Sequence, residues 1–133
     1  MQPMNRIRWH GPRAAIGLCA VLAGPYDFLP FTEAYLNDLF GPPADFWRSQ
    51  PINYVRADGP ALLRMHGLRD TRVSPNNTRS LTAALQALGA AVTTRYFPQA
   101  GYGDLVAAFS PVRKGLPVLP DIVNFIADQS PAD

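Results

Sequence analysis

Residues 60–75 read PALLRMHGLRDTRVSP, and this stretch decides the fold. The apolar run Ala61–Met65 has the length and composition of a strand that is buried in a parallel sheet. Ser74 and Pro75 then supply a hydroxyl cap and a proline for the first helical position, so they predict a helix start. Asp70 therefore stands at the carboxyl end of a parallel strand, where α/β enzymes present acidic catalytic residues.

The chain before this stretch contains a second strand pattern and one short helix. Residues 1–13 show no apolar periodicity, so we expect an irregular lead-in. The continuous apolar run Ala14–Ala23 predicts another strand buried on both faces of a parallel sheet. Thr32 is a suitable N-cap for a helix over Glu33–Phe40, because its hydroxyl can accept a hydrogen bond from the first turn. A polar and aromatic connection, Asp45–Asp58, leads to the central strand.

Downstream of this stretch, helix and strand signals alternate again. Gly89 is suited to end a helix, because glycine adopts the left-handed conformation found at many helix ends. Val92–Phe97 is rich in β-branched and aromatic residues and predicts a third strand, and Asp104–Phe109 has the pattern of a short helix. The apolar residues that repeat at helical spacing are Leu81, Ala84, Leu85 and Leu88 before Gly89, and Leu119, Ile122, Val123 and Ile126 near the end of the chain.

These signals follow one another as strand, helix, strand, helix, strand, helix. Strands that alternate with helices pair in parallel, because each crossover returns the chain to the same end of the sheet. We therefore predict an α/β fold with about three parallel strands and flanking helices, formed by residues 14–133.

The composition limits the kind of protein that this chain can be. A chain of 133 residues is one domain or part of one, and an apolar content of 47% excludes wholesale disorder. The formal net charge is +2, and Arg6, Arg8 and Arg13 are too sparse for the basic stripe of a nucleic-acid-binding protein. His10 and His66 lie far apart without partners at metal-ligand spacing. We expect neither a nucleic-acid partner nor a metal site.

The amino-terminal region weakly imitates a signal peptide. Arginines precede the apolar residues 14–24, but this run is too short to cross a bilayer. It continues into Pro25 without a cleavage site of small residues. Cys19 is the single cysteine, so no disulfide can form within the chain. We expect a cytoplasmic protein without a membrane partner, in which Cys19 is a small core residue.

Four segments resemble the carboxyl-terminal half of an α/β-hydrolase of the carboxylesterase/lipase type. His66–Val73 is the most specific of them for this superfamily, because it follows a strand and precedes a helix. Tyr96–Gly101 leads into the loop where the family places its catalytic histidine, and Leu22–Phe28 and Ser49–Ile52 also match. The resemblance covers about residues 14–128. It implies a serine hydrolase of small or medium carboxylic esters, which uses no cofactor.

Asp70 matches the acid position of this family, whose triad runs in the chain order serine, acid, histidine. The resemblance implies that Asp70 accepts the imidazole N–H and stabilises the imidazolium that forms during acyl transfer. The residues alone are equally consistent with an acidic turn residue that precedes a helix. The family resemblance favours descent from the triad acid.

Tyr102 stands where the family has its histidine. An unperturbed phenol has a pKa of about 10, so it is a poor general base for a serine hydroxyl at neutral pH. We expect the neutral Tyr102 hydroxyl to donate a hydrogen bond to Asp70, which would hold the loop without a proton relay. We do not expect His66 or His10 to replace the missing base, because His66 is structural in the family and His10 lies in the lead-in.

The chain has no Gly-x-Ser-x-Gly turn, so it also lacks the family nucleophile. Its serines, none of which has the flanking glycines, are Ser49, Ser74, Ser80, Ser110 and Ser130. Two hypotheses stay open. One is a fragment or degenerate member of an ester hydrolase family, and the other is a non-catalytic binding or self-associating module derived from that fold. In both, we expect the edge of the Ala14–Ala23 strand to bind a second copy or a missing amino-terminal half.

Overall fold

A computed structural model of the protein describes residues 17–112 and 115–129. The predicted lead-in of residues 1–13, with His10 and its three arginines, lies outside the described residues. Residues 14–16 of the first predicted strand and Ser130 lie outside them as well. Within the described part, no helix is long and apolar enough to cross a membrane.

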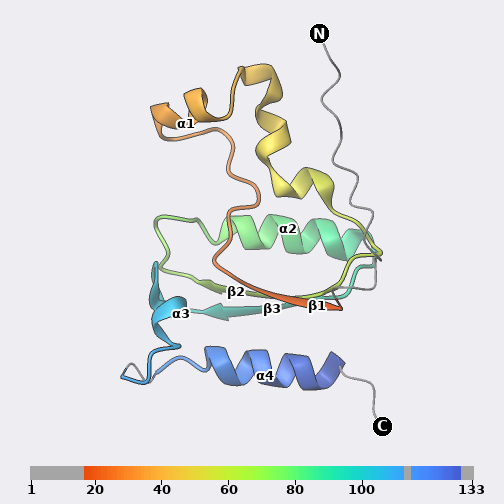
Figure 1. The fold of residues 1–133 in the computed structure, drawn as a ribbon, viewed down its shortest axis with the longest axis vertical. Coiled ribbons are helices and arrows are strands. Elements are labelled where there is room, and N and C mark those ends of the chain that lie inside the picture. Colours follow the sequence, from red (N-terminus) through yellow and green to blue (C-terminus); the bar gives the residue numbers. More distant parts are fainter. Residues whose placement is uncertain (1–16, 113–114, 130–133) are drawn as a thin grey trace.

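Three parallel strands form one sheet with the order β1-β2-β3 (Figure 1). They are β1 (Leu18–Leu22), β2 (Ala61–Gly67) and β3 (Val92–Phe97). The predicted bounds of the third strand are confirmed, and β2 runs on to Gly67, beyond the predicted end. The first strand ends one residue earlier than predicted, because Ala23 has a φ of 48° and turns the chain out of the sheet.

Helices cover both faces of this sheet, which confirms the predicted α/β architecture. In Figure 1, α2 (Asn76–Ala87) lies on one face and α4 (Val118–Gln129) lies on the other. The shorter elements are α1 (Ala34–Leu39), the 3₁₀ helices η2 (Pro43–Ser49) and η3 (Pro51–Tyr54), and α3 (Asp104–Ala107). α1 and the 3₁₀ helices lie beyond α2, away from the sheet (Figure 1). The segment predicted as a polar and aromatic connection, Asp45–Asp58, is thus largely 3₁₀ helix.

The helix ends only partly follow the predictions. Glu33, and not Thr32, is the N-cap of α1, and no side chain caps that helix. α2 begins just after Pro75, and the Ser74 hydroxyl oxygen accepts a hydrogen bond from the backbone N–H of Asn76 at 3.3 Å. Gly89 has a φ of 73°, so this glycine ends α2 in the left-handed conformation as predicted.

The core consists of one apolar cluster on each side of the sheet. Successive strand side chains point to opposite faces, so Leu63 and Met65 of β2 pack with Phe125 of α4, whereas Leu62 packs with Leu81 of α2. Two predicted helix faces are partly wrong. The exposed apolar side chains are Leu88 at the end of α2 and Leu119, Val123 and Ile126 on α4. α4 carries apolar residues on both sides, so spacing alone did not identify its buried side.

An arginine is buried on the α2 side of the sheet. Arg64 is 1% exposed, and its guanidinium contacts the Thr82 hydroxyl at 3.3 Å and lies 5.6 Å from the centre of the Tyr26 ring. Its Nε and Nη1 atoms have no hydrogen-bond partner among the described residues. Burial lowers the pKa of Arg64, and burial raises the pKa of Tyr26 to about 12. This face of the core therefore contains polar groups with few partners.

Candidate active site

Asp70 lies in a tight loop between β2 and α2, and its side chain is only 1% exposed. Its Oδ1 atom accepts hydrogen bonds from the backbone N–H groups of Arg72 and Val73, both at 2.9 Å. The backbone N–H of Asp70 itself donates to the Gly67 carbonyl at 3.2 Å. These short-range bonds fix the carboxylate in place at the carboxyl end of the central strand.

The second carboxylate oxygen of Asp70, Oδ2, has no such backbone donors. Asp70 Oδ2 is buried and has no hydrogen-bond partner among the described residues. The nearest basic group is Nε2 of His66, at 3.4 Å. A buried carboxylate oxygen is stabilised by a hydrogen-bond donor, so Oδ2 is an acceptor that a donor from a neighbouring group could use.

His66 is fully buried at the end of β2, and both of its ring nitrogens are occupied. Nε2 lies 2.8 Å from the Val73 carbonyl oxygen, and Nδ1 lies 2.7 Å from the Thr78 hydroxyl. A carbonyl can only accept, so Nε2 donates to Val73, and the Thr78 hydroxyl is the partner of Nδ1. His66 thus links the end of β2, the loop that carries Asp70 (residues 67–73, the acid loop) and α2.

Tyr102 lies in the loop between β3 and α3, and it is 60% exposed. Its ring centre is 5.0 Å from the guanidinium carbon of Arg72. The expected hydrogen bond from Tyr102 to Asp70 is wrong, because Asp70 Oδ2 has no partner. The physical reason is competition: a cation attracts the face of an aromatic ring, and an exposed phenol loses nothing by leaving its hydroxyl in water.

The loop that carries Tyr102 (residues 98–103, the Tyr102 loop) packs against the acid loop. The N–H of Arg69 donates to the Ala100 carbonyl at 2.9 Å, and Gly101 N–H donates to the Asp104 carboxylate at 2.6 Å. A Cβ atom at Gly67 would collide with the Ala100 carbonyl oxygen, so only glycine permits this approach. The two loops that would carry the acid and the histidine are therefore in direct contact.

The serines of the described chain have no imidazole beside them. His66 is the histidine in this part of the chain, and its nitrogens lie next to Val73, Thr78 and Asp70 rather than a serine. The Ser49 hydroxyl donates to the Phe46 carbonyl at 2.7 Å, and the Ser74 oxygen accepts from the first turn of α2. No group of three or more potential metal ligands occurs among the described residues.

Two further polar residues shape this end of the sheet, and sequence reasoning missed both. Asn77 Oδ1 accepts the backbone N–H groups of Tyr26 at 2.8 Å and Asp27 at 2.7 Å. Gln50 Oε1 accepts the backbone N–H of Phe28 at 2.6 Å. These buried amides hold the turn after β1 beside the acid loop. Their partners are distant in sequence, so no local pattern indicates them.

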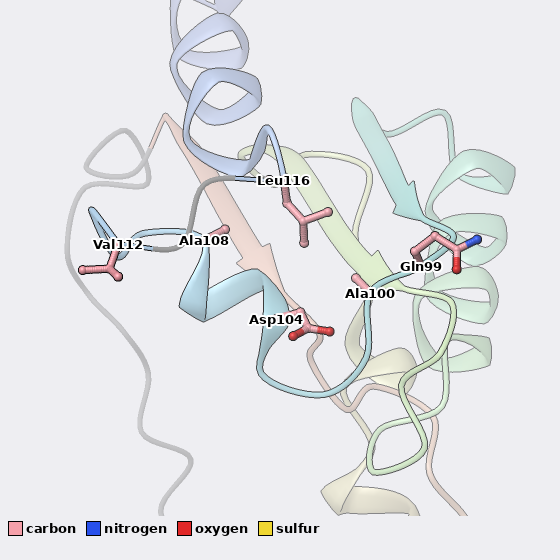
Figure 2. A pocket seen from close by; sticks show the side chains of 7 residues that line it. Gln99, Ala100, Asp104, Ala108, Val112 and Leu116 are labelled. Atoms are coloured by element: carbon pink, nitrogen blue, oxygen red, sulfur yellow. The ribbon is translucent and has the colours of Figure 1, made fainter.

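An open pocket of about 480 Å³ lies beside the Tyr102 loop (Figure 2). Its lining consists of Gln99, Ala100, Asp104, Ala108, Val112, Gly115 and Leu116. Figure 2 shows that these residues come from the loop after β3, from α3 and from the segment before α4. Neither Asp70 nor Tyr102 lines the pocket, so it is a separate hollow and not the site of the acid.

Solved esterases share this arrangement of sheet and helices. The carboxylesterase Cest-2923 from Lactobacillus plantarum WCFS1 is 15% identical, with a TM-score of 0.65 over 85% of this chain and 44% of that one. An acetyl ester-xyloside bifunctional hydrolase from Caldicellulosiruptor lactoaceticus is 17% identical, with a TM-score of 0.67 over 84% and 42%. A truncated carbohydrate esterase from gut microbiota is 21% identical, with a TM-score of 0.63 over 85% and 42%.

This chain therefore spans less than half the length of these solved structures, which show its fold. No curated protein matches its sequence. Residues 14–128 match the model of the Prolyl oligopeptidase family. Because that match covers most of the chain, and because the three parallel strands have the α/β-hydrolase arrangement, the chain belongs to the prolyl oligopeptidase family of the α/β-hydrolase superfamily.

Proposed function

We propose that this chain is the acid-bearing, carboxyl-terminal part of a serine hydrolase of carboxylic esters, and that it is catalytically incomplete as it stands. In this proposal Asp70 keeps the position of the triad acid, and Tyr102 replaces the triad histidine. The nucleophilic serine would lie in a part of the hydrolase fold that this chain does not match. The single observation that carries the proposal is the buried Asp70 oxygen without a donor.

The two carboxylate oxygens of Asp70 support this proposal because only one of them has hydrogen-bond donors. Two backbone N–H groups hold Oδ1, and Oδ2 is left as a bare acceptor next to the loop of Tyr102. The turn needs only Oδ1 as an acceptor, so a residue that served only the turn could leave its second oxygen in water. An imidazole N–H donated from the Tyr102 position would satisfy Oδ2, which is the contact that a triad acid makes.

The loss of the imidazole has a large expected cost. In serine hydrolases of the triad type, removal of the serine or the histidine lowers turnover by about six orders of magnitude. A tyrosine that stacks on Arg72 cannot take the proton of a serine hydroxyl at neutral pH. We therefore expect no measurable ester hydrolysis by this chain alone.

The substrate class follows from the relatives and is part of the proposal. The family model is named for a peptidase, and the solved relatives are named as esterases of carboxylic and carbohydrate esters. Both reactions are acyl transfers through a serine. We choose small carboxylic esters because the three solved structures described above are all named for ester hydrolysis, and a peptide substrate is the second arm of the test.

The experiment joins this chain to the amino-terminal half of a family member that contains the Gly-x-Ser-x-Gly turn. Hydrolysis of a nitrophenyl acetate and of a proline-containing peptide is measured for four forms. They are the unchanged chain, Tyr102→His, Tyr102→Phe as the matched control, and Tyr102→His with Asp70→Asn.

We expect activity only in the Tyr102→His form, with a loss of about 10²-fold or more when Asp70→Asn is added. Equal activity of the unchanged chain and the Tyr102→His form would refute the proposal that Tyr102 interrupts the relay. Hydrolysis of the peptide without hydrolysis of the ester would refute the proposed substrate class.

A further inference from the structure

We propose that Arg72 makes the candidate site selective for an ester that carries a carboxylate of its own, and that Arg69 on the same loop adds to this preference. The inference deepens the proposed function and rests on it, because it names the charge of the substrate that the acid loop would meet. It depends on where Arg72 is held, on which of its N–H groups are available, and on a contrast with the other surface arginines.

Arg72 is held at both ends, close to the two positions that define the site. Its backbone N–H donates to Asp70 Oδ1 at 2.9 Å, so the residue is tied to the acid. Its guanidinium carbon lies 5.0 Å from the ring centre of Tyr102, the residue at the histidine position. In a triad hydrolase the histidine lies against the reacting groups. The side chain of Arg72 therefore places a positive charge beside the point where acyl transfer would occur.

The contact with Tyr102 does not use the hydrogen-bonding capacity of Arg72. The cation is attracted by the face of the ring, whereas the N–H groups of a guanidinium lie in its own plane. Arg72 is exposed, and its guanidinium forms no ion pair or hydrogen bond with another described residue. A planar fork of N–H groups binds a carboxylate through two parallel hydrogen bonds. A carboxylate is therefore the ligand that suits this side chain best.

The other surface arginines of the described chain already have acidic or amide partners. These pairs are Arg48 with Asp45 at 3.3 Å, Arg56 with Asp58 at 2.8 Å, Arg95 with Asp121 at 4.0 Å, and Arg79 with Asn76 at 2.9 Å. Arg69 and Arg72 are the exposed arginines to which residues 17–112 and 115–129 supply no such partner, and both belong to the acid loop. Positive charge is thus left for a ligand at the candidate site.

Asp70 does not neutralise these two arginines. Its carboxylate is buried, its Oδ1 accepts backbone N–H groups, and the basic group near its Oδ2 is His66 at 3.4 Å. The ligand carboxylate can come from either part of an ester, and Arg72 would meet the same chemistry in both cases. Monoesters of dicarboxylic acids carry it on the acyl part, and acetylated hydroxybenzoates carry it on the alcohol part.

The first test measures binding by the 133-residue chain itself, so it does not depend on catalysis. Adipate and hydroxybenzoate model the two parts of the ester, and their uncharged amides are the controls. Each is titrated at constant ionic strength, while NMR follows the backbone and guanidinium N–H signals. We expect saturable shifts at Arg69 and Arg72 with at least one of the acids and with neither amide.

Two variants make this titration specific. Arg72→Gln should abolish the shifts, because it removes the guanidinium and keeps the backbone N–H to Asp70. Arg79→Gln is the matched control, because Arg79 also lies over a ring, that of Tyr96, at 5.6 Å. Absence of shifts with both acids would overturn the proposal, and so would equal shifts in the unchanged chain and in Arg72→Gln.

The second test measures selectivity in the joined protein that carries Tyr102→His. The ratio kcat/KM is compared for the nitrophenyl monoester of adipic acid against nitrophenyl hexanoate, and for acetoxybenzoate against its methyl ester. We expect the charged ester to be preferred about tenfold or more in at least one pair, and that pair identifies the part that carries the carboxylate. Arg72→Gln should remove the preference, and Arg79→Gln should keep it.

The outcomes separate this inference from the proposed function. An active protein in which Arg72→Gln leaves the preference between charged and neutral esters unchanged would overturn the inference and leave the proposed function intact. A joined protein without activity would instead contradict the proposed function, and the binding titration would then decide on Arg72 alone.

Discussion

The acid loop and the Tyr102 loop touch each other, but the central side chain of one is buried and that of the other is exposed. The acid loop, residues 67–73, is held by Asp70, His66 and their buried bonds. The Tyr102 loop keeps its backbone contacts through Ala100, but its central side chain lies at the surface on Arg72. Backbone hydrogen bonds, and not the central side chain, hold the Tyr102 loop against the acid loop.

His66→Ala should give the largest difference between the two loops. It removes a fully buried ring with two hydrogen bonds, so we expect a loss of about 3 kcal/mol in the free energy of unfolding. Tyr102→Ala is the matched change in the other loop and should stay within about 0.5 kcal/mol. Chemical denaturation of both variants measures this. Similar losses for both variants would show that the two loops do not differ in how their central side chains contribute to stability.

Gly67→Ala tests the contact between the loops. The added Cβ would meet the Ala100 carbonyl oxygen, so strand end and loop must move apart at a cost of about 2 kcal/mol. Gly115→Ala is the control, because nothing lies within 4 Å of a Cβ there. Thermal unfolding should show a lower midpoint for Gly67→Ala alone. An unchanged midpoint would mean that the end of β2 and the Tyr102 loop are not in tight contact.

The turn after β1 offers a pH test of the same end of the sheet. The pKa of Tyr26 is raised to about 12 by burial, against 10.0 for a free tyrosine. The neutral phenol is therefore favoured in the folded state, and its contribution to stability is complete below pH 10 and is lost as the pH rises toward 12. Unfolding free energies measured from pH 9 to 12 should fall more steeply for the unchanged chain than for Tyr26→Phe. Parallel curves would show that Tyr26 is not buried.

Asp70→Asn should have the smallest effect on the free energy of unfolding, and it tests the proposed role of Asp70 as the triad acid. The amide oxygen can still accept the Arg72 and Val73 N–H groups, and the variant loses a buried charge whose second oxygen has no donor. We expect the free energy of unfolding to stay equal or to rise by about 1 kcal/mol. A clear loss would mean that the carboxylate is kept for stability. In that case the reading of Asp70 as a catalytic remnant would lose its support.

The alternation of strands and helices follows from local patterns, so a parallel α/β sheet could be predicted from the sequence. The apolar run Ala61–Met65 and the β-branched segment Val92–Phe97 indicate strands, and Gly89 indicates a helix end. The buried side of α4 could not be predicted, because Leu119 and Val123 are apolar and yet exposed.

The candidate site was predictable only in part. The place of Asp70 after a strand and before a helix is equally consistent with a turn residue, and only the family resemblance favours the triad acid. The partners of Tyr102 and Asn77 were not, because each contact joins segments that lie far apart in the chain. The Arg72–Tyr102 contact replaced the expected bond to Asp70, and no spacing rule in the sequence distinguishes these two outcomes.

The most direct measurement concerns the bare oxygen of Asp70. In the Tyr102→His variant of this chain, NMR titration of the introduced imidazole reports whether it meets the carboxylate. We predict that this ring titrates at a pH about 1 higher than in the variant that also carries Asp70→Asn, because a nearby carboxylate favours the imidazolium. Identical titration midpoints in the two variants would contradict the claim that this end of the sheet still holds the place of a triad histidine.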